Sequence, residues 1–133
     1  MKRTRWAVFF AAAILLGGVV AAQKEDAKRA PGKFELACAA GDCPLLKGAP
    51  QTSGMRGGSV KLKPGESVGW HSTGENEEAL VILKGSGAAR IEGRPDIGFH
   101  DGELIYIPSG KRHNVTNTGA DVLEYVWVVA PTR

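Results

Sequence analysis

The chain has 133 residues, which suffices for one domain and not for two. It carries 17 Lys and Arg against 14 Asp and Glu, and Lys2, Arg3 and Arg5 account for the whole excess. Beyond residue 22 the formal charge is therefore balanced. No basic excess therefore remains in this part of the chain to indicate nucleic acid or an anionic membrane as a partner.

Residues 1–22 have the pattern of a secretory signal peptide. Basic residues precede an apolar run over 6–20, and Val20 and Ala22 provide the small residues of a cleavage site before Gln23. An uncleaved membrane anchor is the alternative, although the run is short of the roughly 20 residues that a span requires. We expect an exported protein, periplasmic or extracellular, without stable membrane insertion after cleavage.

Residues 23–55 are expected to form a leader and an irregular segment. The first part, 23–33, is polar and charged, which is typical of a flexible leader. Short apolar pieces over 34–57 predict a loop with one or two short strands on the outside of the domain. Because an exported chain folds in an oxidising compartment, Cys38 and Cys43 predict a disulfide. Free thiols and a redox pair remain the alternatives.

Beyond residue 57, short apolar and β-branched stretches alternate with Gly, Pro, Asn and Asp. Such spacing predicts an all-β sandwich or barrel, whose interior has room for side chains or one small ligand. No stretch sustains the apolar period of a helix. The expected strands are 59–63, 67–71, 78–83, 87–92, 103–107, 113–117 and 122–129.

Two of the three histidines stand in segments that suit a binding site. Alternate residues of a strand share a face, so His71 and Thr73 are expected to point the same way. Glu78 begins the returning strand and can face them, while His113 follows a Pro-Ser-Gly turn on the other side of the barrel. Two imidazoles and one carboxylate in one interior predict a metal site.

Other polar and aromatic residues compete for roles in this site. Glu75 and Glu77 are alternatives to Glu78, with solvated loop charge as their simpler interpretation. His100 is expected to be exposed in a turn. We assign Thr73 and Tyr106 to the pocket lining, with packing against strand neighbours as the alternative for Tyr106.

The segments that contain His71 and His113 resemble the two conserved motifs of the cupin superfamily, and the resemblance covers about residues 56–130. The first motif, Gly-x5-His-x-His-x3–4-Glu-x6-Gly, is matched by Gly65, His71, Glu78 and Gly85. The second, Gly-x5-Pro-x-Gly-x2-His-x3-Asn, is matched at every position by Gly102, Pro108, Gly110, His113 and Asn117. The resemblance implies a single cupin-type β-barrel, a double-stranded β-helix, over residues 56–133.

The resemblance also implies a function. Cupins commonly bind a divalent metal (Fe, Mn, Zn or Ni) through the two histidines and the glutamate of the first motif and the histidine of the second. Here Thr73 replaces one histidine, which leaves His71, Glu78 and His113 as a 2-His-1-carboxylate set. The resemblance implies a metal-dependent enzyme of the dioxygenase, isomerase or lyase type. The alternative is a metal-free module that binds a sugar or another polar small molecule, and either form can be a homodimer.

Overall fold

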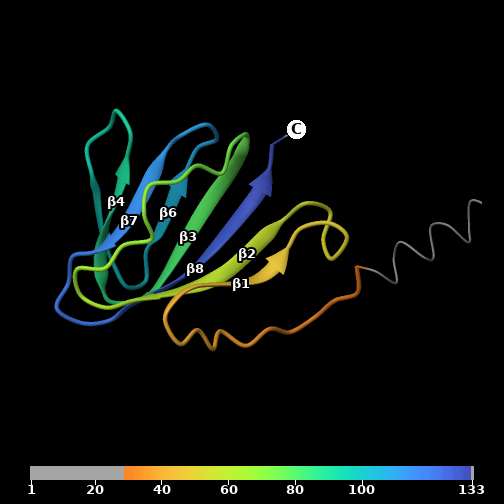
Figure 1. The fold of residues 1–133 in the computed structure, drawn as a ribbon, viewed down its shortest axis with the longest axis horizontal. Helices are drawn as coiled ribbons and strands as arrows, with labels where there is room; N and C mark the ends of the chain where they lie inside the picture. The colour runs from red at the N-terminus through yellow and green to blue at the C-terminus, as the bar shows by residue number, and fades with distance from the viewer. Residues whose placement is uncertain (1–28, 133) are drawn as a thin grey trace, which may run out of the picture. The chain divides into compact units, whose positions relative to one another are not determined.

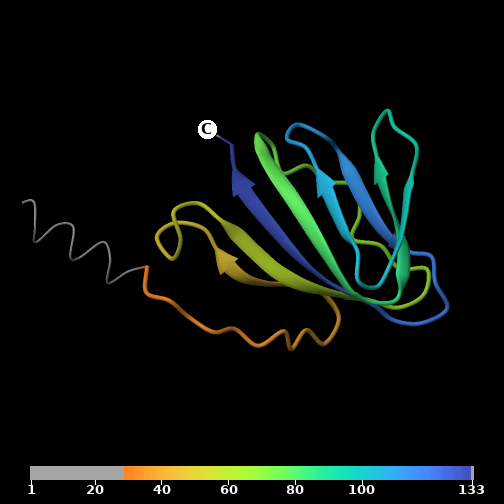
Figure 2. The same cartoon turned by 180° about the vertical axis from the view of Figure 1, so that it is seen from behind.

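Two antiparallel sheets form the domain in the computed structural model, which describes residues 29–132 (Figures 1 and 2). The larger sheet has the order β1-β2-β8-β3-β6, and the smaller has the order β5-β4-β7. The strands are β1 (Gly41–Lys47), β2 (Arg56–Leu62), β3 (Asn76–Lys84), β4 (Ser86–Ile91), β5 (Ile97–His100), β6 (Leu104–Ile107), β7 (His113–Asn117) and β8 (Leu123–Pro131). The prediction of an all-β fold is confirmed, and no helix long and apolar enough to cross a membrane occurs in the described part.

The strand β8 lies at the centre of the larger sheet and pairs with both β2 and β3. Its alternate residues Leu123, Tyr125 and Val129 are buried and face the smaller sheet, as the two-residue period of a strand requires. The buried core between the sheets comprises Val60, Leu62, Leu80, Ile82, Ala89, Ile91, Phe99, Ile105, Ile107, Val115, Leu123 and Tyr125. Removing this apolar surface from water supplies the main stabilisation of the fold.

The expected strand over 67–71 is not regular, and this prediction was wrong in detail. The segment runs beside β7 through only two isolated bridges, which pair Ser67 with Thr116 and His71 with His113. Between these two bridges the segment advances by four residues, from 67 to 71, whereas β7 advances by three, from 113 to 116. The segment therefore has one extra residue between the bridges. Gly69 has a φ of 85°, a left-handed conformation that glycine adopts without steric cost. The segment therefore carries a β-bulge immediately before His71.

The sequence analysis missed β5, which pairs with β4 at the edge of the smaller sheet. This strand is short and contains Gly98, and only Phe99 is buried. The strand is therefore too short to show a recognisable alternation of apolar and polar residues. Phe99 packs over Gly87, where an added Cβ would lie 2.6 Å from the ring. The small residue on β4 thus makes room for the aromatic side chain.

The segment before β2 contributes a strand to the larger sheet. Residues 34–57 were expected to carry one or two strands on the outside of the domain, and β1 instead pairs with β2 at the sheet edge. The predicted disulfide is present and joins Cys43 of this strand to Cys38, which precedes the strand. The predicted signal peptide, 1–22, lies outside the described residues.

Candidate metal centre

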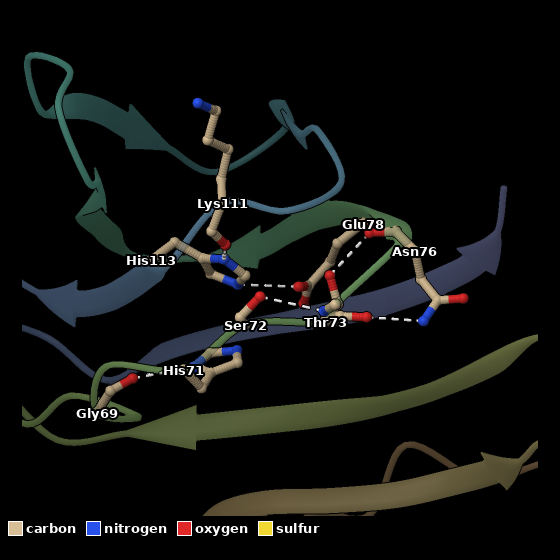
Figure 3. A network of polar contacts seen from close by, with 9 residues as sticks. Gly69, His71, Ser72, Thr73, Asn76, Glu78, Lys111 and His113 are labelled. Carbon is tan, nitrogen blue, oxygen red and sulfur yellow. Dashed lines mark hydrogen bonds and ion pairs between the residues drawn. The ribbon is translucent and has the colours of Figure 1, made fainter.

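Two histidines from separate segments are joined by an antiparallel backbone bridge. The amide of His71 donates to the carbonyl oxygen of His113 at 2.9 Å, and the amide of His113 donates to the carbonyl oxygen of His71 at the same distance. Residues directly opposite in such a pair have their side chains on one face of the sheet. The two ring centroids accordingly lie 4.3 Å apart, and Figure 3 shows both rings near Glu78.

Each imidazole is oriented by a carbonyl oxygen two residues before it. His71 Nδ1 lies 2.9 Å from the oxygen of Gly69, and His113 Nδ1 lies 3.0 Å from the oxygen of Lys111 (Figure 3). Because a carbonyl oxygen only accepts hydrogen bonds, each Nδ1 carries the proton. In the neutral imidazoles this leaves both Nε2 atoms with free lone pairs, the arrangement that metal-binding histidines usually show.

Glu78 supplies a buried carboxylate opposite His113. It lies on β3 between Ile107 of β6 and Val129 of β8, with only 6% of its surface exposed. Glu78 Oε2 lies 2.9 Å from His113 Nε2. Neither atom has a well-aligned hydrogen bond, although both are fully buried. Buried polar atoms without such a bond are rare in folded proteins, and either a proton on His113 Nε2 or a cation bound between the two atoms would satisfy both.

The environment of His113 favours its protonated form when no metal is bound. Complete burial lowers the pKa of His113, but contact with the Glu78 carboxylate and the Lys111 carbonyl raises it above its usual value. Tyr125, near the same carboxylate, has a pKa raised mainly by burial and further by the charges of Glu78 and Asp42. A cation is therefore favoured at this point of the interior.

The three donors fit a divalent ion. The ligand atoms of His71, Glu78 and His113 all lie within 4.8 Å of one another. An ion with bonds of about 2.1 Å holds neighbouring donors roughly 3 Å apart and opposite donors roughly 4.2 Å apart. Glu78 and His113 already have the spacing of neighbours, and the exposed His71 can close the remaining distance by a small side-chain movement.

Thr73 occupies the position of the missing histidine, but its hydroxyl is used in a turn. Thr73 Oγ1 donates to the carbonyl oxygen of Asn76 at 2.9 Å, and Asn76 Nδ2 donates back to the carbonyl oxygen of Thr73 at 2.7 Å. These bonds fix the entry into β3 (Figure 3). Thr73 lines the pocket as expected, and its side chain shapes the loop beside the donors.

A cavity of about 170 Å³ opens beside His71 and Glu78. Water occupies about 30 Å³ per molecule, so the cavity suits a ligand of only a few non-hydrogen atoms. Its polar lining consists of Asp42, Arg56, His71, Ser72, Thr73 and Glu78. Its less polar wall consists of Val60, Val68, Val115, Tyr125, Trp127 and Val129.

Sequence reasoning missed the part that β1 and β2 play in this cavity. Trp127 of β8 lies across Gly58 of β2, and its Nε1 donates to Asp42 of β1 at 2.7 Å. A Cβ at Gly58 would lie 3.0 Å from the indole, so a larger residue would displace the ring. A lone Asp or Gly in the sequence gives no sign of this arrangement, because it depends on the strand order.

Other predicted site residues lie outside the cavity. Tyr106 was assigned to the lining, but it points outward with 53% exposure and donates to Glu77 at 2.7 Å. The reason is the alternation of β6, in which Ile105 and Ile107 take the inward positions. Glu75 and Glu77 are exposed. His100 is exposed as expected, although it ends β5 and does not lie in a turn, and it contacts Glu103.

A comparison with known families matches residues 58–129 to the Cupin_2 family, described as the cupin domain. The chain belongs to the cupins. Among solved structures, BH2720 from Bacillus halodurans aligns with a TM-score of 0.63 and 20% identity, over 97% of this chain and 86% of that one. At this identity the likeness concerns the fold alone.

Two relatives of this cupin have closer sequences. The oxalate-binding protein of Thermotoga maritima is 36% identical over 70 residues, which are 53% of this chain and 57% of that protein. The tetracenomycin polyketide synthase protein TcmJ of Streptomyces glaucescens is 30% identical over 80 residues, which are 60% of this chain and 52% of that protein. The cupin thus matches about half the length of each.

Proposed function

We propose that this cupin binds one divalent metal ion, of Fe, Mn, Zn or Ni, through His71, Glu78 and His113, and uses it on a small molecule. The observation that carries the proposal is the buried contact between His113 Nε2 and Glu78 Oε2. They are 2.9 Å apart, yet neither has a well-aligned hydrogen bond. A bound cation would satisfy both atoms, and the protonated Nδ1 atoms present the imidazoles in the form that metals require.

The arrangement suits a metal-dependent enzyme of the dioxygenase, isomerase or lyase type. Three protein donors leave coordination positions open, where a bound ion would polarise a substrate oxygen or activate O₂. The cavity beside the donors has room for a few non-hydrogen atoms, and valine side chains line one side of it. The name of the oxalate-binding relative supports a small molecule as the ligand.

The deciding experiment is elemental analysis of the purified full chain. The expected result is close to one equivalent of a transition metal, lost when His113 is replaced with Ala. The matched control is His100→Ala, because His100 lies exposed outside the cluster. Protein that takes up none of the four metals when incubated with each would contradict the proposal.

A metal-free binding module for a sugar or another polar molecule is the second candidate. Thr73 favours it, since its hydroxyl is a poor metal ligand but can still accept a hydrogen bond while it donates to Asn76, and Ser72 also lines the cavity. Calorimetric titration of metal-free protein with small polyols and sugars separates the two candidates. Unchanged affinity with and without metal supports the binding module.

We also propose that the protein is exported and acts in a periplasmic or extracellular space, without stable membrane insertion. The disulfide between Cys38 and Cys43 supports this location, because such bonds persist in oxidising compartments. Mass spectrometry of the native protein tests the proposal, and a chain that begins at Gln23 is expected. A chain retaining residues 1–22 in the membrane fraction would contradict it.

A homodimer is proposed on the outer face of the larger sheet. Val81 on β3 and Leu104 on β6 are paired in register and point outward, and Leu104 is 63% exposed. Exposed apolar patches of this kind often mark interfaces. Light scattering of the full chain should give twice the monomer mass, and Leu104→Lys should reduce it to the monomer mass. A monomeric wild-type protein would contradict the proposal.

A further inference from the structure

Arg56 is a solvent-exposed residue on the inner face of the larger sheet, in register with the donor Glu78. Arg56 of β2 pairs with Val129 of β8, and Val129 pairs with Glu78 of β3. Val60 and Leu62 follow on the inward face of β2, so the two-residue period places Arg56 on that face. With about 4.8 Å between neighbouring strands, the Arg56 and Glu78 backbones lie roughly 10 Å apart. An arginine side chain spans much of that distance.

No described acidic residue pairs with Arg56. The ion pairs formed among residues 29–132 do not include it, although it contributes to the cavity lining. Asp42, another lining residue, pairs with Val60, four residues along β2 from Arg56, and its carboxylate accepts the indole N–H of Trp127. Across the strand pair, Arg56 stands opposite Lys47. Like charges directly opposite destabilise a sheet, and the Arg56 guanidinium has no ion-pair partner among residues 29–132, so a carboxylate bound beside it would be stabilised.

We propose that Arg56 binds the carboxylate of a small organic acid whose other end reaches His71, Glu78 and His113. This proposal rests on the proposed function, since the three donors would hold an ion at the far end. The guanidinium fork matches a carboxylate in a bidentate manner. Asp42 and Glu78 share the lining, so a doubly charged phosphate would meet more repulsion than a single carboxylate.

The size and wall of the cavity define the ligand further. A volume of about 170 Å³ is smaller than the roughly 300–1,000 Å³ of drug-sized sites. Valine side chains and the Trp127 ring form one wall, and Ser72 and Thr73 form part of another. The ligand class is therefore a short hydroxy- or oxo-carboxylic acid, with a carboxylate at Arg56 and an oxygen directed toward the three donors.

The test is calorimetric titration of the full-length protein with lactate, pyruvate, the neutral analogue lactamide and inorganic phosphate. Binding of lactate or pyruvate is expected, with much weaker binding of lactamide and phosphate. Arg56→Gln should weaken carboxylate binding by about tenfold or more, because it removes a charge-assisted bond. Arg94→Gln is the matched control, since Arg94 is an exposed arginine outside the cavity.

The outcomes separate this inference from the metal proposal. Arg56→Gln should retain the metal content of the wild-type protein, because Arg56 is not one of the three donors. Carboxylate binding that is equal in Arg56→Gln and wild type, or absent from both, overturns the role of Arg56 whatever the metal content. Equal or tighter binding of lactamide or phosphate overturns the ligand class. Metal-free wild-type protein with Arg56-dependent binding overturns only the metal centre.

Discussion

His71 and His113 exchange two backbone hydrogen bonds of 2.9 Å, so a residue of one cupin motif is paired directly with a residue of the other. This pairing fixes the distance between the two backbones from which the imidazoles extend. It is reinforced by a second link between the motifs, in which the amide of Gly110 donates to the carbonyl oxygen of Gly74. The candidate centre is thus built on paired backbone and is not formed by mobile side chains alone.

The bulge at Gly69 is predicted to set the position of His71. Gly69→Ala should cost about 1–2 kcal/mol, because its φ of 85° is unfavourable for a residue with a Cβ. It should also weaken metal binding by about tenfold or more, because the Gly69 carbonyl orients His71 Nδ1. Urea unfolding and metal titration measure the two effects.

Gly93→Ala is the matched control for this substitution. Gly93 has a φ of 74°, and an added Cβ meets no atom within 4 Å at either glycine. The two variants should lose similar stability, but only Gly69→Ala should lose metal affinity. Equal metal affinity in both variants would show that the bulge does not position His71.

Gly58→Ala is predicted to disturb both the sheet and the cavity. The added Cβ would lie 2.5 Å from the carbonyl oxygen of Cys43 and 3.0 Å from the Trp127 ring. Overpacking of this kind costs about 1–3 kcal/mol, and the indole should move away from Asp42. Unfolding curves and tryptophan fluorescence report the change. Gly98→Ala is the control, because its Cβ meets nothing within 4 Å, and a similar loss in both variants would contradict the prediction.

The metal-free protein is predicted to lose stability as the pH rises. The pKa of His113 is raised in the folded state, so this group contributes its full stabilisation below about pH 6.5 and loses it as the pH rises through the folded value. Thermal unfolding in a chelator should therefore give a falling Tm above about pH 6.5. Metal affinity should instead increase as the pH rises, because the ligands must be deprotonated to bind the metal.

Two variants isolate the contribution of His113. The pKa of exposed His100 is also raised, by the Asp101 carbonyl and then by Glu103, so the experiment uses the His100→Ala protein as its reference. Glu78→Gln in that background should reduce the fall in Tm, because it removes the carboxylate that raises the pKa of His113. A slope unaffected by Glu78→Gln would contradict this origin.

The disulfide between Cys38 and Cys43 is predicted to contribute modestly to stability. The two cysteines are 5 residues apart, and closing so short a loop lowers the entropy of the unfolded chain by the equivalent of about 2 kcal/mol. The double variant Cys38→Ser, Cys43→Ser should lower the unfolding free energy by about that amount. Wild-type protein in a reductant should lose a similar amount of unfolding free energy. An unchanged unfolding midpoint would show that the loop is already ordered in the unfolded chain.

Much of the barrel could be predicted from the sequence because its signals are local. The segment 113–117 was predicted with the bounds that β7 has, since a Pro-Ser-Gly turn precedes it. The all-β class followed from short apolar runs between turn residues. The choice of Glu78 over Glu77 followed from its spacing to Gly85, and only Glu78 is buried in the cluster with His71 and His113.

The rest depends on how distant strands pair, which local patterns do not encode. Asp42 and Arg56 reach the cavity only because β1 and β2 extend the larger sheet beside β8. The bulge before His71 depends on a one-residue difference between two segments. Tyr106 was placed in the lining although alternation with the buried Ile105 and Ile107 turns it outward, an error that attention to strand period would have avoided.

The hydrogen bonds from each imidazole to a carbonyl two residues earlier have a consequence for engineering. Each ring takes its orientation from a tripeptide of its own, 69–71 in one case and 111–113 in the other. The outer surface of the barrel can therefore be redesigned extensively while the direction of the ring nitrogens is preserved. Deleting or inserting a single amino acid within either tripeptide should misdirect that ring, however well the remainder of the scaffold tolerates the change.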